Sequence, residues 1–281
     1  MNMKLKSILE MPLNVFAIIM LVLFIIPILI PMGLPLNISN SVKQYYDVIN
    51  KLPPGSIVML QNGLQMSALP EFEAADVVCL KILFEKARDL KIIIWCGNID
   101  GPSITNRLLR KANVEKTGRV YGTDYVLFGY APSTEAGLTA LAKSFRDMYP
   151  TDYFGTPTDA IPMMKNIFSI KDITLYIHLG GAPNVDILSR QLYVPYKTRI
   201  ISNLEPGGLP RILPFYPTVV TAYIDGTSGA AELEVLTHYP GLGSTMNDAT
   251  NLVVIGFVSL LFIGNISLFK KDIIKTIRGA E

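Results

Sequence analysis

Four short stretches rich in glycine, asparagine, glutamine and serine contain the residues best suited to hold a small ligand. They are Gln61-Asn62-Gly63, Gly97-Asn98, residues 129–133 and residues 180–184. Glycine lets a ligand approach the backbone closely, and a helix that follows offers free backbone N–H groups to an anion or a carboxylate. The candidate ligand contacts are Asn62, Asn98, Gly129, Ser133, Gly180 and Gly181. The alternative is that each stretch is only a turn from a strand into a helix.

Known catalytic and cofactor motifs are missing from the sequence. It contains neither of the nucleotide-binding patterns G-x-G-x-x-G and G-x-x-x-x-G-K-[ST], and neither of the hydrolytic motifs G-x-S-x-G and H-E-x-x-H. His178 and His238 are the only histidines, and Cys79 and Cys96, the only cysteines, lack metal-ligand spacing. We therefore predict no metal and no cofactor, interpret both cysteines as buried thiols, and favour no enzymatic activity.

Apolar runs with the composition of strands precede the four polar stretches. The predicted strands cover residues 56–60, 92–95, 125–128, 173–179 and 197–201. Apolar residues at three- and four-residue steps predict helices over residues 72–90, 103–112, 134–148 and 185–192. Alternating strands and helices predict a mostly parallel sheet with helices on both faces, a three-layer Rossmann-like α/β domain. Ligands of such sheets bind beyond the carboxyl ends of the strands, where the four polar stretches would lie.

Several boundaries in this pattern depend on single residues. Ser103 and Ser133 are predicted to cap the helices that follow them, because a serine hydroxyl can accept from a free backbone N–H.

Residues 209–225 combine three prolines with apolar residues, which predicts a kinked helix on the sheet or an element against a membrane or a neighbouring subunit. Residues 229–238 are predicted as a helix, and residues 241–250 as a linker.

Two apolar segments frame this pattern. No charged residue occurs between Asp248 and Lys270, and about 20 residues of helix cross a hydrocarbon core of roughly 30 Å. Residues 13–34 form a second apolar run, interpreted as a span because another follows at the far end of the chain. The predicted organisation is an N-terminal transmembrane anchor (1–34), an α/β domain (35–246), and a C-terminal transmembrane helix with a basic tail (247–281).

The short flanks of the two segments predict the orientation of the chain in a cell membrane. Their basic residues are Lys4, Lys6, Lys270, Lys271, Lys275 and Arg278. Because positive flanks stay on the cytoplasmic side, both termini are predicted in the cytoplasm and the α/β domain outside, with the reverse orientation as the alternative. A net charge of +2 without a basic stripe argues against nucleic acid as a partner.

Partner subunits are also predicted. Charged residues make up 17% of the chain, below the roughly 25% of soluble proteins, so little of the surface is strongly solvated. Gly256, Ser259 and Ser267 fall on one face of the second span, where small residues allow close helix packing. These features predict a homo-oligomer or an assembly with other membrane subunits. The alternative is that this face, the predicted seam of Gly256, Ser259 and Ser267, packs against the first span of the same chain.

Three motifs resemble a family of uncharacterised prokaryotic membrane-anchored proteins with a Rossmann-like α/β domain. The motifs are Gly129-Tyr130-Ala131-Pro132, residues 150–157 (PTDYFGTP) and residues 229–234 (GAAELE). The resemblance covers most of the chain from Leu34 onward. It implies the same architecture and transfers no functional residues.

Two functions are compatible with these features. The first is a two-span membrane protein that serves as a subunit or scaffold of an oligomeric membrane assembly. The alternative is a membrane-tethered domain that binds a small ligand, or an enzyme, using the loops at the carboxyl ends of the parallel strands.

Overall fold

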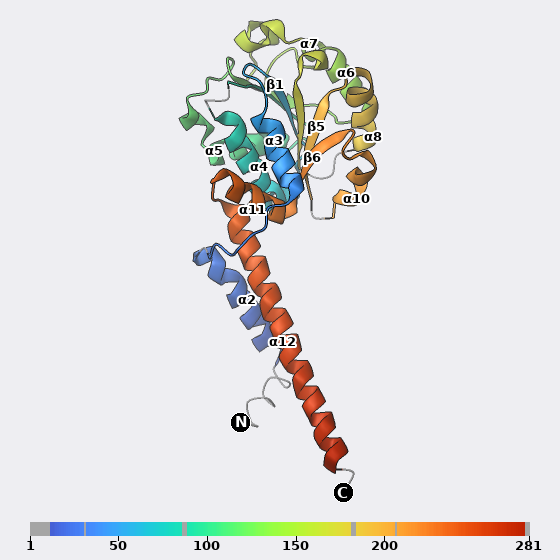
Figure 1. Cartoon of the computed structure of the whole chain (residues 1–281). Coiled ribbons are helices and arrows are strands. Elements are labelled where there is room, and N and C mark those ends of the chain that lie inside the picture. The colour runs from blue at the N-terminus through green and yellow to red at the C-terminus, as the bar shows by residue number, and fades with distance from the viewer. Residues whose placement is uncertain (1–11, 31, 86–88, 181–183, 206, 279–281) are drawn as a thin grey trace. The chain divides into compact units, whose positions relative to one another are not determined.

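The computed structural model describes residues 12–30, 32–85, 89–180, 184–205 and 207–278. It divides into two compact units (Figure 1). One unit is Leu36–Ser244, and the other combines Met1–Pro35 with Thr245–Glu281.

The larger unit is built on a parallel sheet. Its strands in the described residues are β1 (Ile57–Asn62), β2 (Lys91–Cys96), β3 (Tyr125–Tyr130), β4 (Leu175–Leu179), β5 (Arg199–Leu204) and β6 (Val220–Asp225). The order across the sheet is β3-β2-β1-β4-β5-β6, and every neighbouring pair is parallel. The order reverses direction between β1 and β4, which makes the carboxyl ends of these two strands the switch point of the sheet. The prediction of a Rossmann-like α/β domain is confirmed.

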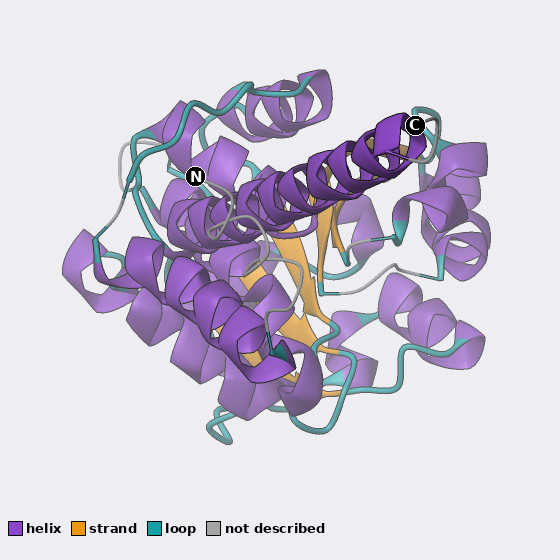
Figure 2. Ribbon diagram, turned by 90° about the horizontal axis from the view of Figure 1, so that it is seen from below, coloured by secondary structure: helices purple, strands orange, loops and turns teal. Residues whose placement is uncertain are grey.

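Helices cover both faces of this sheet (Figure 2). One face carries α3 (Asn40–Asn50), α4 (Leu69–Phe84), α5 (Gly101–Lys111) and α11 (Gly226–Thr237). The other face carries α6 (Glu135–Lys143), α7 (Phe145–Met148), α8 (Val185–Leu188), α9 (Val194–Tyr196) and α10 (Leu209–Ile212). Successive strand residues alternate between the two cores: in β2, Ile92 and Ile94 face the α4 side, and Ile93 and Trp95 the α6 side.

Both predicted serine caps are wrong. Helix α5 already begins at Gly101, and the hydroxyl of Ser103 donates to the carbonyl oxygen of Asp100 at 2.9 Å. Helix α6 is capped by Thr134, whose Oγ1 accepts from the N–H of Gly137 at 3.3 Å. Ser133 therefore lies before the helix, where its hydroxyl remains available. The helix predicted over residues 134–148 is also interrupted at Ser144, whose extended backbone ends α6 before α7 begins.

The segment over residues 209–225, predicted as a kinked helix, is a short helix followed by a strand. A short α10 is followed by β6, an edge strand in which Val220, Ala222 and Ile224 are buried and the residues between them half-buried. The prolines precede the strand and do not interrupt it, so edge pairing with β5 is possible. Helix α3, which was not predicted, buries Val42 and Ile49 in the core. Helix α4 ends at Phe84, short of the predicted end at residue 90.

The smaller unit contains α2 (Leu13–Leu29) and most of α12 (Leu242–Arg278). In the described residues, α12 is the one helix long and apolar enough to cross a membrane, over Leu242–Ile266, a stretch of 25 residues. Helix α2 is apolar but has 17 residues. Because α12 begins at Leu242, the predicted linker over residues 241–250 is wrong: this stretch is helical.

Helices α2 and α12 pack against each other within the smaller unit. The rings of Phe16 and Phe257 meet edge to face, 6.3 Å between centroids. A Cβ on Gly256 would collide with the side chain of Leu23, so glycine is what lets α2 approach here. Of the other two residues of the predicted seam, Ser259 is exposed. The side chain of Ser267 lies outside the described residues.

Candidate functional site

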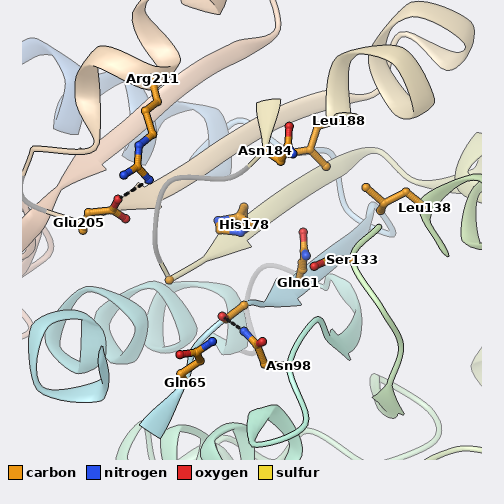
Figure 3. A pocket seen from close by; sticks show the side chains of 12 residues that line it. Gln61, Gln65, Asn98, Ser133, Leu138, His178, Asn184, Leu188, Glu205 and Arg211 are labelled. Carbon is orange, nitrogen blue, oxygen red and sulfur yellow. Dashed lines mark hydrogen bonds and ion pairs between the residues drawn. The ribbon is translucent and has the colours of Figure 1, made fainter. Parts of the chain in front are cut away.

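A polar crevice of about 510 Å³ opens at the switch point of the sheet, beyond the carboxyl ends of β1 and β4 (Figure 3). The residues that line it are Gln61, Gly63, Gln65, Asn98, Ser133, Leu138, His178, Gly180, Asn184, Leu188, Glu205 and Arg211. A smaller hollow of about 270 Å³ on the α4 side shares Gly63, Gln65, Gly180 and Glu205 with it. Parallel sheets that reverse their order bind ligands at this position.

Gln61 and His178 lie side by side in the floor of this crevice. They are register partners in the parallel pair of β1 and β4, so their side chains point to the same face of the sheet. Both are almost fully buried, with 4% of Gln61 and 6% of His178 exposed. Polar side chains in two otherwise apolar strands are thus placed together at the crevice.

The amide of Gln61 is held in one orientation. Its Oε1 accepts a hydrogen bond from the hydroxyl of Tyr176 at 2.6 Å. Its Nε2 has no hydrogen-bond partner among the described residues and lies beside Gly97, where a Cβ would come within 2.9 Å of it. Gln61 therefore presents two N–H donors to the crevice.

The imidazole of His178 is neutral. Burial lowers its pKa from 6.5 to about 4. Its Nδ1 lies 3.5 Å from Oγ of the buried Ser202, and its Nε2 finds no partner among the described residues. Nε2 lies beside Gly63, where a Cβ would come within 3.1 Å of it. The absence of a side chain at Gly63 leaves this nitrogen open to the crevice.

The loops around the crevice are tied to one another. The amide of Asn98 donates to the carbonyl oxygen of Gly63, which joins the loop after β2 to the loop after β1. Gly180 has a φ of +84°, and a Cβ there would also collide with Leu64, so glycine is required at the end of β4. Asn184 accepts from the N–H of Ile187 at 3.4 Å and begins α8.

Charge in the lining is balanced. Its charged side chains, Glu205 and Arg211, form an ion pair with 2.9 Å between Arg211 Nη1 and Glu205 Oε1. At the nearby start of α6, Glu135 places a carboxylate in the first turn, and Arg190 pairs with it at 3.1 Å. A carboxylate at this position opposes the anion that a helix N-terminus would otherwise attract. The charged groups named here are thus paired with one another, and the expectation that these loops suit an anion stays a prediction.

The six candidate contacts have different positions in the structure. Asn98, Ser133 and Gly180 line the crevice. Asn62 points away from it into the α5 side, where its Nδ2 donates to Oγ1 of Thr105 at 2.8 Å and its Oδ1 accepts from the N–H of Leu64 at 2.9 Å. Gly129 is not part of the lining. Gly181 lies outside the described residues.

Neither residue in the floor is among the six candidate contacts, although Gln61 belongs to one of the four predicted polar stretches. Gln61 and His178 are polar residues near the carboxyl ends of largely apolar strands, and that is the signal by which they could have been found. Strand composition alone does not reveal that β1 and β4 are neighbours, however. Asn184 lies in the predicted stretch 180–184 but is not one of the six candidate contacts. Gln65, Glu205 and Arg211 were missed, because each follows a strand at a distance that only the fold determines.

Other potential reactive groups do not form a site. Among the described residues, no group of three or more His, Cys, Asp or Glu side chains could hold a metal ion. Cys79 and Cys96 are free and buried, as predicted, and burial raises the pKa of each thiol to about 12. Protonated thiols are poor nucleophiles and poor metal ligands.

Comparisons with known proteins add little about function. No family model and no curated protein matches the chain. Among solved structures, the chain is similar to the C-terminal domain of a group 1 family glycosyl transferase (LpcC) from Francisella tularensis, with 9% identity and a TM-score of 0.30. The match covers 79% of this chain and 95% of that domain. A TM-score this low does not bear on the site.

Proposed function

We propose that the protein is a membrane-tethered domain that binds a small molecule in the crevice between β1 and β4. The observation that carries this proposal is the pair Gln61 and His178, whose Nε2 atoms lie at the switch point and have no hydrogen-bond partner among the described residues. Both nitrogens are open to the crevice and are not among the described polar atoms that are buried without a partner. A ligand that replaces water at these nitrogens would gain about 0.5–1.5 kcal/mol for each hydrogen bond that it forms.

Binding is favoured over catalysis by the chemistry of the same residues. A general base works best when its pKa is near the operating pH, and burial holds the pKa of His178 at about 4. Ser202, its neighbour, is fully buried on β5 and is not exposed to the crevice. The charged residues of the lining, Glu205 and Arg211, neutralise each other.

The tether in this proposal is the pair of helices α2 and α12. Val254, Ile255, Val258 and Phe262 of α12 are all exposed in the structure, which suits contact with lipid. The 17 residues of α2 are at the lower end of the roughly 17–25 that span a bilayer. We propose that both helices span the cell membrane, with the termini in the cytoplasm and the α/β domain outside.

The binding function can be tested with the full chain in lipid nanodiscs. A library of small metabolites is screened by thermal shift against the wild type and the Gln61→Leu and His178→Leu variants. We expect compounds that raise the Tm of the wild type and fail to do so in either variant, because binding to the folded state adds stability. If every stabilising compound acts equally on the variants, or none is found, the crevice is not a binding site.

The orientation is tested separately in intact cells that express the chain. Protease added outside is expected to cleave the α/β domain without permeabilisation. Cleavage only after permeabilisation would reverse the assignment.

Membership of an oligomeric membrane assembly is the second candidate function. It is favoured by the position of Ser259, which is exposed on α12 and remains available to a helix of another subunit. Sizing of the detergent-extracted protein tests this proposal. A monodisperse monomer at micromolar concentration would contradict self-association.

A further inference from the structure

The side chains that line the crevice are mostly neutral groups that donate and accept hydrogen bonds. Gln65, Asn98 and Asn184 carry carboxamides, and Ser133 carries a hydroxyl. Carboxamides and hydroxyls have donor and acceptor atoms in one group. Asn98 already donates to the carbonyl oxygen of Gly63, and Asn184 already accepts from the N–H of Ile187, so Oδ1 of Asn98 and Nδ2 of Asn184 are the atoms left for a ligand. A ligand hydroxyl both donates and accepts, so it can bind at either kind of atom. With Gln61 and His178 in the floor, polar partners surround the space on several sides (Figure 3).

The charges of the lining do not provide a counter-ion for a ligand. Glu205 and Arg211 are paired with each other, and His178 is uncharged. Glu135, in the first turn of α6, is likewise paired with Arg190. A charged ligand that leaves water needs an opposite charge or several charge-assisted hydrogen bonds, and otherwise its desolvation opposes binding. A neutral ligand has no such requirement.

The crevice also has a small apolar wall. Leu138 of α6 and Leu188 of α8 line it, and both side chains are buried. The volume of about 510 Å³ is within the range of roughly 300–1,000 Å³ of ordinary small-molecule sites. A ring with C–H groups on one face and hydroxyls around its edge would contact the two leucines and the polar floor together.

We infer that the ligand of this crevice is an uncharged, hydroxyl-rich ring compound, of the class of a monosaccharide, a disaccharide or a cyclic polyol. This inference rests on the proposed binding function and specifies its ligand class. Gln61 donates to a ligand hydroxyl through Nε2, and Nε2 of His178 binds a neighbouring hydroxyl. Tyr176 is a positioning residue, because it holds the amide of Gln61 without touching the ligand.

The test compares neutral compounds with their phosphorylated forms on the full chain in nanodiscs. The probes are glucose, galactose, mannose, their common disaccharides and myo-inositol, and the monophosphate of each monosaccharide and of inositol, measured by isothermal titration calorimetry. We expect at least one neutral compound to bind with a Kd of about 1 mM or tighter, and at least tenfold tighter than its phosphate. The Gln61→Leu variant should weaken this binding at least tenfold.

Two further variants make the result decisive. Ser133→Ala changes a polar group at the edge of the lining and tests the same site if Gln61→Leu does not fold. Asn166→Ala, at an exposed position outside the lining, should bind like the wild type. If phosphates bind as tightly as the neutral compounds, and Gln61→Leu or Ser133→Ala weakens them, the ligand class is wrong and the crevice remains the site. If no probe binds, or binding is unchanged in both lining variants, the ligand class is wrong, and the thermal-shift screen with Gln61→Leu and His178→Leu decides separately whether the crevice binds another ligand.

Discussion

The hydroxyl of Tyr176 donates a hydrogen bond to Oε1 of Gln61 over 2.6 Å, between two side chains that are both buried. This contact occupies the carbonyl of the amide and turns its nitrogen toward the crevice. The two residues come from neighbouring strands β4 and β1, so the sheet itself determines which atom of Gln61 a ligand meets. Tyr176 is not part of the lining, so in the proposed site it would set the polarity of Gln61 without touching the ligand.

Tyr176→Phe should weaken ligand binding without removing any lining residue. Losing a hydrogen bond worth about 1 kcal/mol lets the Gln61 amide rotate, so we expect about a fivefold rise in the Kd of a compound that binds the wild type. Tyr216→Phe is the matched control, because Tyr216 donates to Oε1 of Gln44 at 2.6 Å at an exposed position. Isothermal titration calorimetry on both variants compares the Kd of the same compound, which should rise in Tyr176→Phe and stay unchanged in Tyr216→Phe. Equal effects on binding would contradict the positioning of Gln61 by Tyr176.

His178→Asn should make the protein less sensitive to acid. Burial lowers the pKa of His178 to about 4, so between about pH 6.5 and pH 4 the unfolded chain binds a proton that the folded protein does not. His178 therefore contributes up to roughly 3 kcal/mol to the free energy of unfolding above pH 6.5. This contribution is lost as the pH falls through 4. Urea unfolding at several pH values, followed by the fluorescence of Trp95, the only tryptophan, measures the free energy of unfolding. The exposed His238→Asn variant is the control, and an acid response of His178→Asn equal to that of the wild type would refute the prediction.

Asp76→Asn should have the opposite pH dependence. Burial raises the pKa of Asp76 to about 7, although its Oδ1 accepts from Nδ2 of Asn203 at 2.7 Å. The folded state therefore holds a proton that the unfolded chain has lost above about pH 4. This stabilisation is complete at low pH and is lost as the pH rises through 7, by up to roughly 4 kcal/mol.

The amide in Asp76→Asn stays neutral at every pH. Relative to the wild type, the variant should therefore gain stability as the pH rises from about 4 to about 7. Oδ2 of Asp76 and Oδ1 of Asn203 are both buried without a partner in the described residues, and the new N–H group could donate to the oxygen of Asn203. Asp47→Asn, in an exposed pair with Lys51, is the control. A parallel pH profile for wild type and Asp76→Asn would show that the carboxyl is not protonated in the folded protein.

Gly256→Leu should separate α2 from α12. The added side chain would collide with Leu23, whereas at Gly264 a Cβ meets no other atom within 4 Å, which makes Gly264→Leu the matched control. Cysteines in place of Phe16 and Phe257, whose rings are 6.3 Å apart, report the contact through disulfide formation in the membrane. We expect cross-linking to fall severalfold in Gly256→Leu and to persist in Gly264→Leu. Loss in both variants, or in neither, would contradict the close approach at Gly256.

The sequence by itself determined the layers of the α/β domain. Runs such as residues 92–95 have the continuous apolar character of a strand buried on both faces, and the spacing of α4 has the period of a helix. These patterns are local, because each residue faces the core or the solvent according to its position within its own element. The long apolar stretch of α12 could be identified for the same reason. The start of that helix at Leu242 could not, since its polar first turns carry no such pattern.

Only the tertiary structure decided which strands are neighbours. The site depends on β1 and β4 being adjacent and in a register that places Gln61 beside His178, and no local pattern encodes a pairing between such distant segments. Local pattern also cannot tell Gln61 from Asn62. Gln61 lines the crevice, whereas the side chain of Asn62 donates to Thr105 on the opposite face of the sheet. Successive strand residues point to opposite faces, and which face holds the crevice depends on where the chain crosses over the sheet.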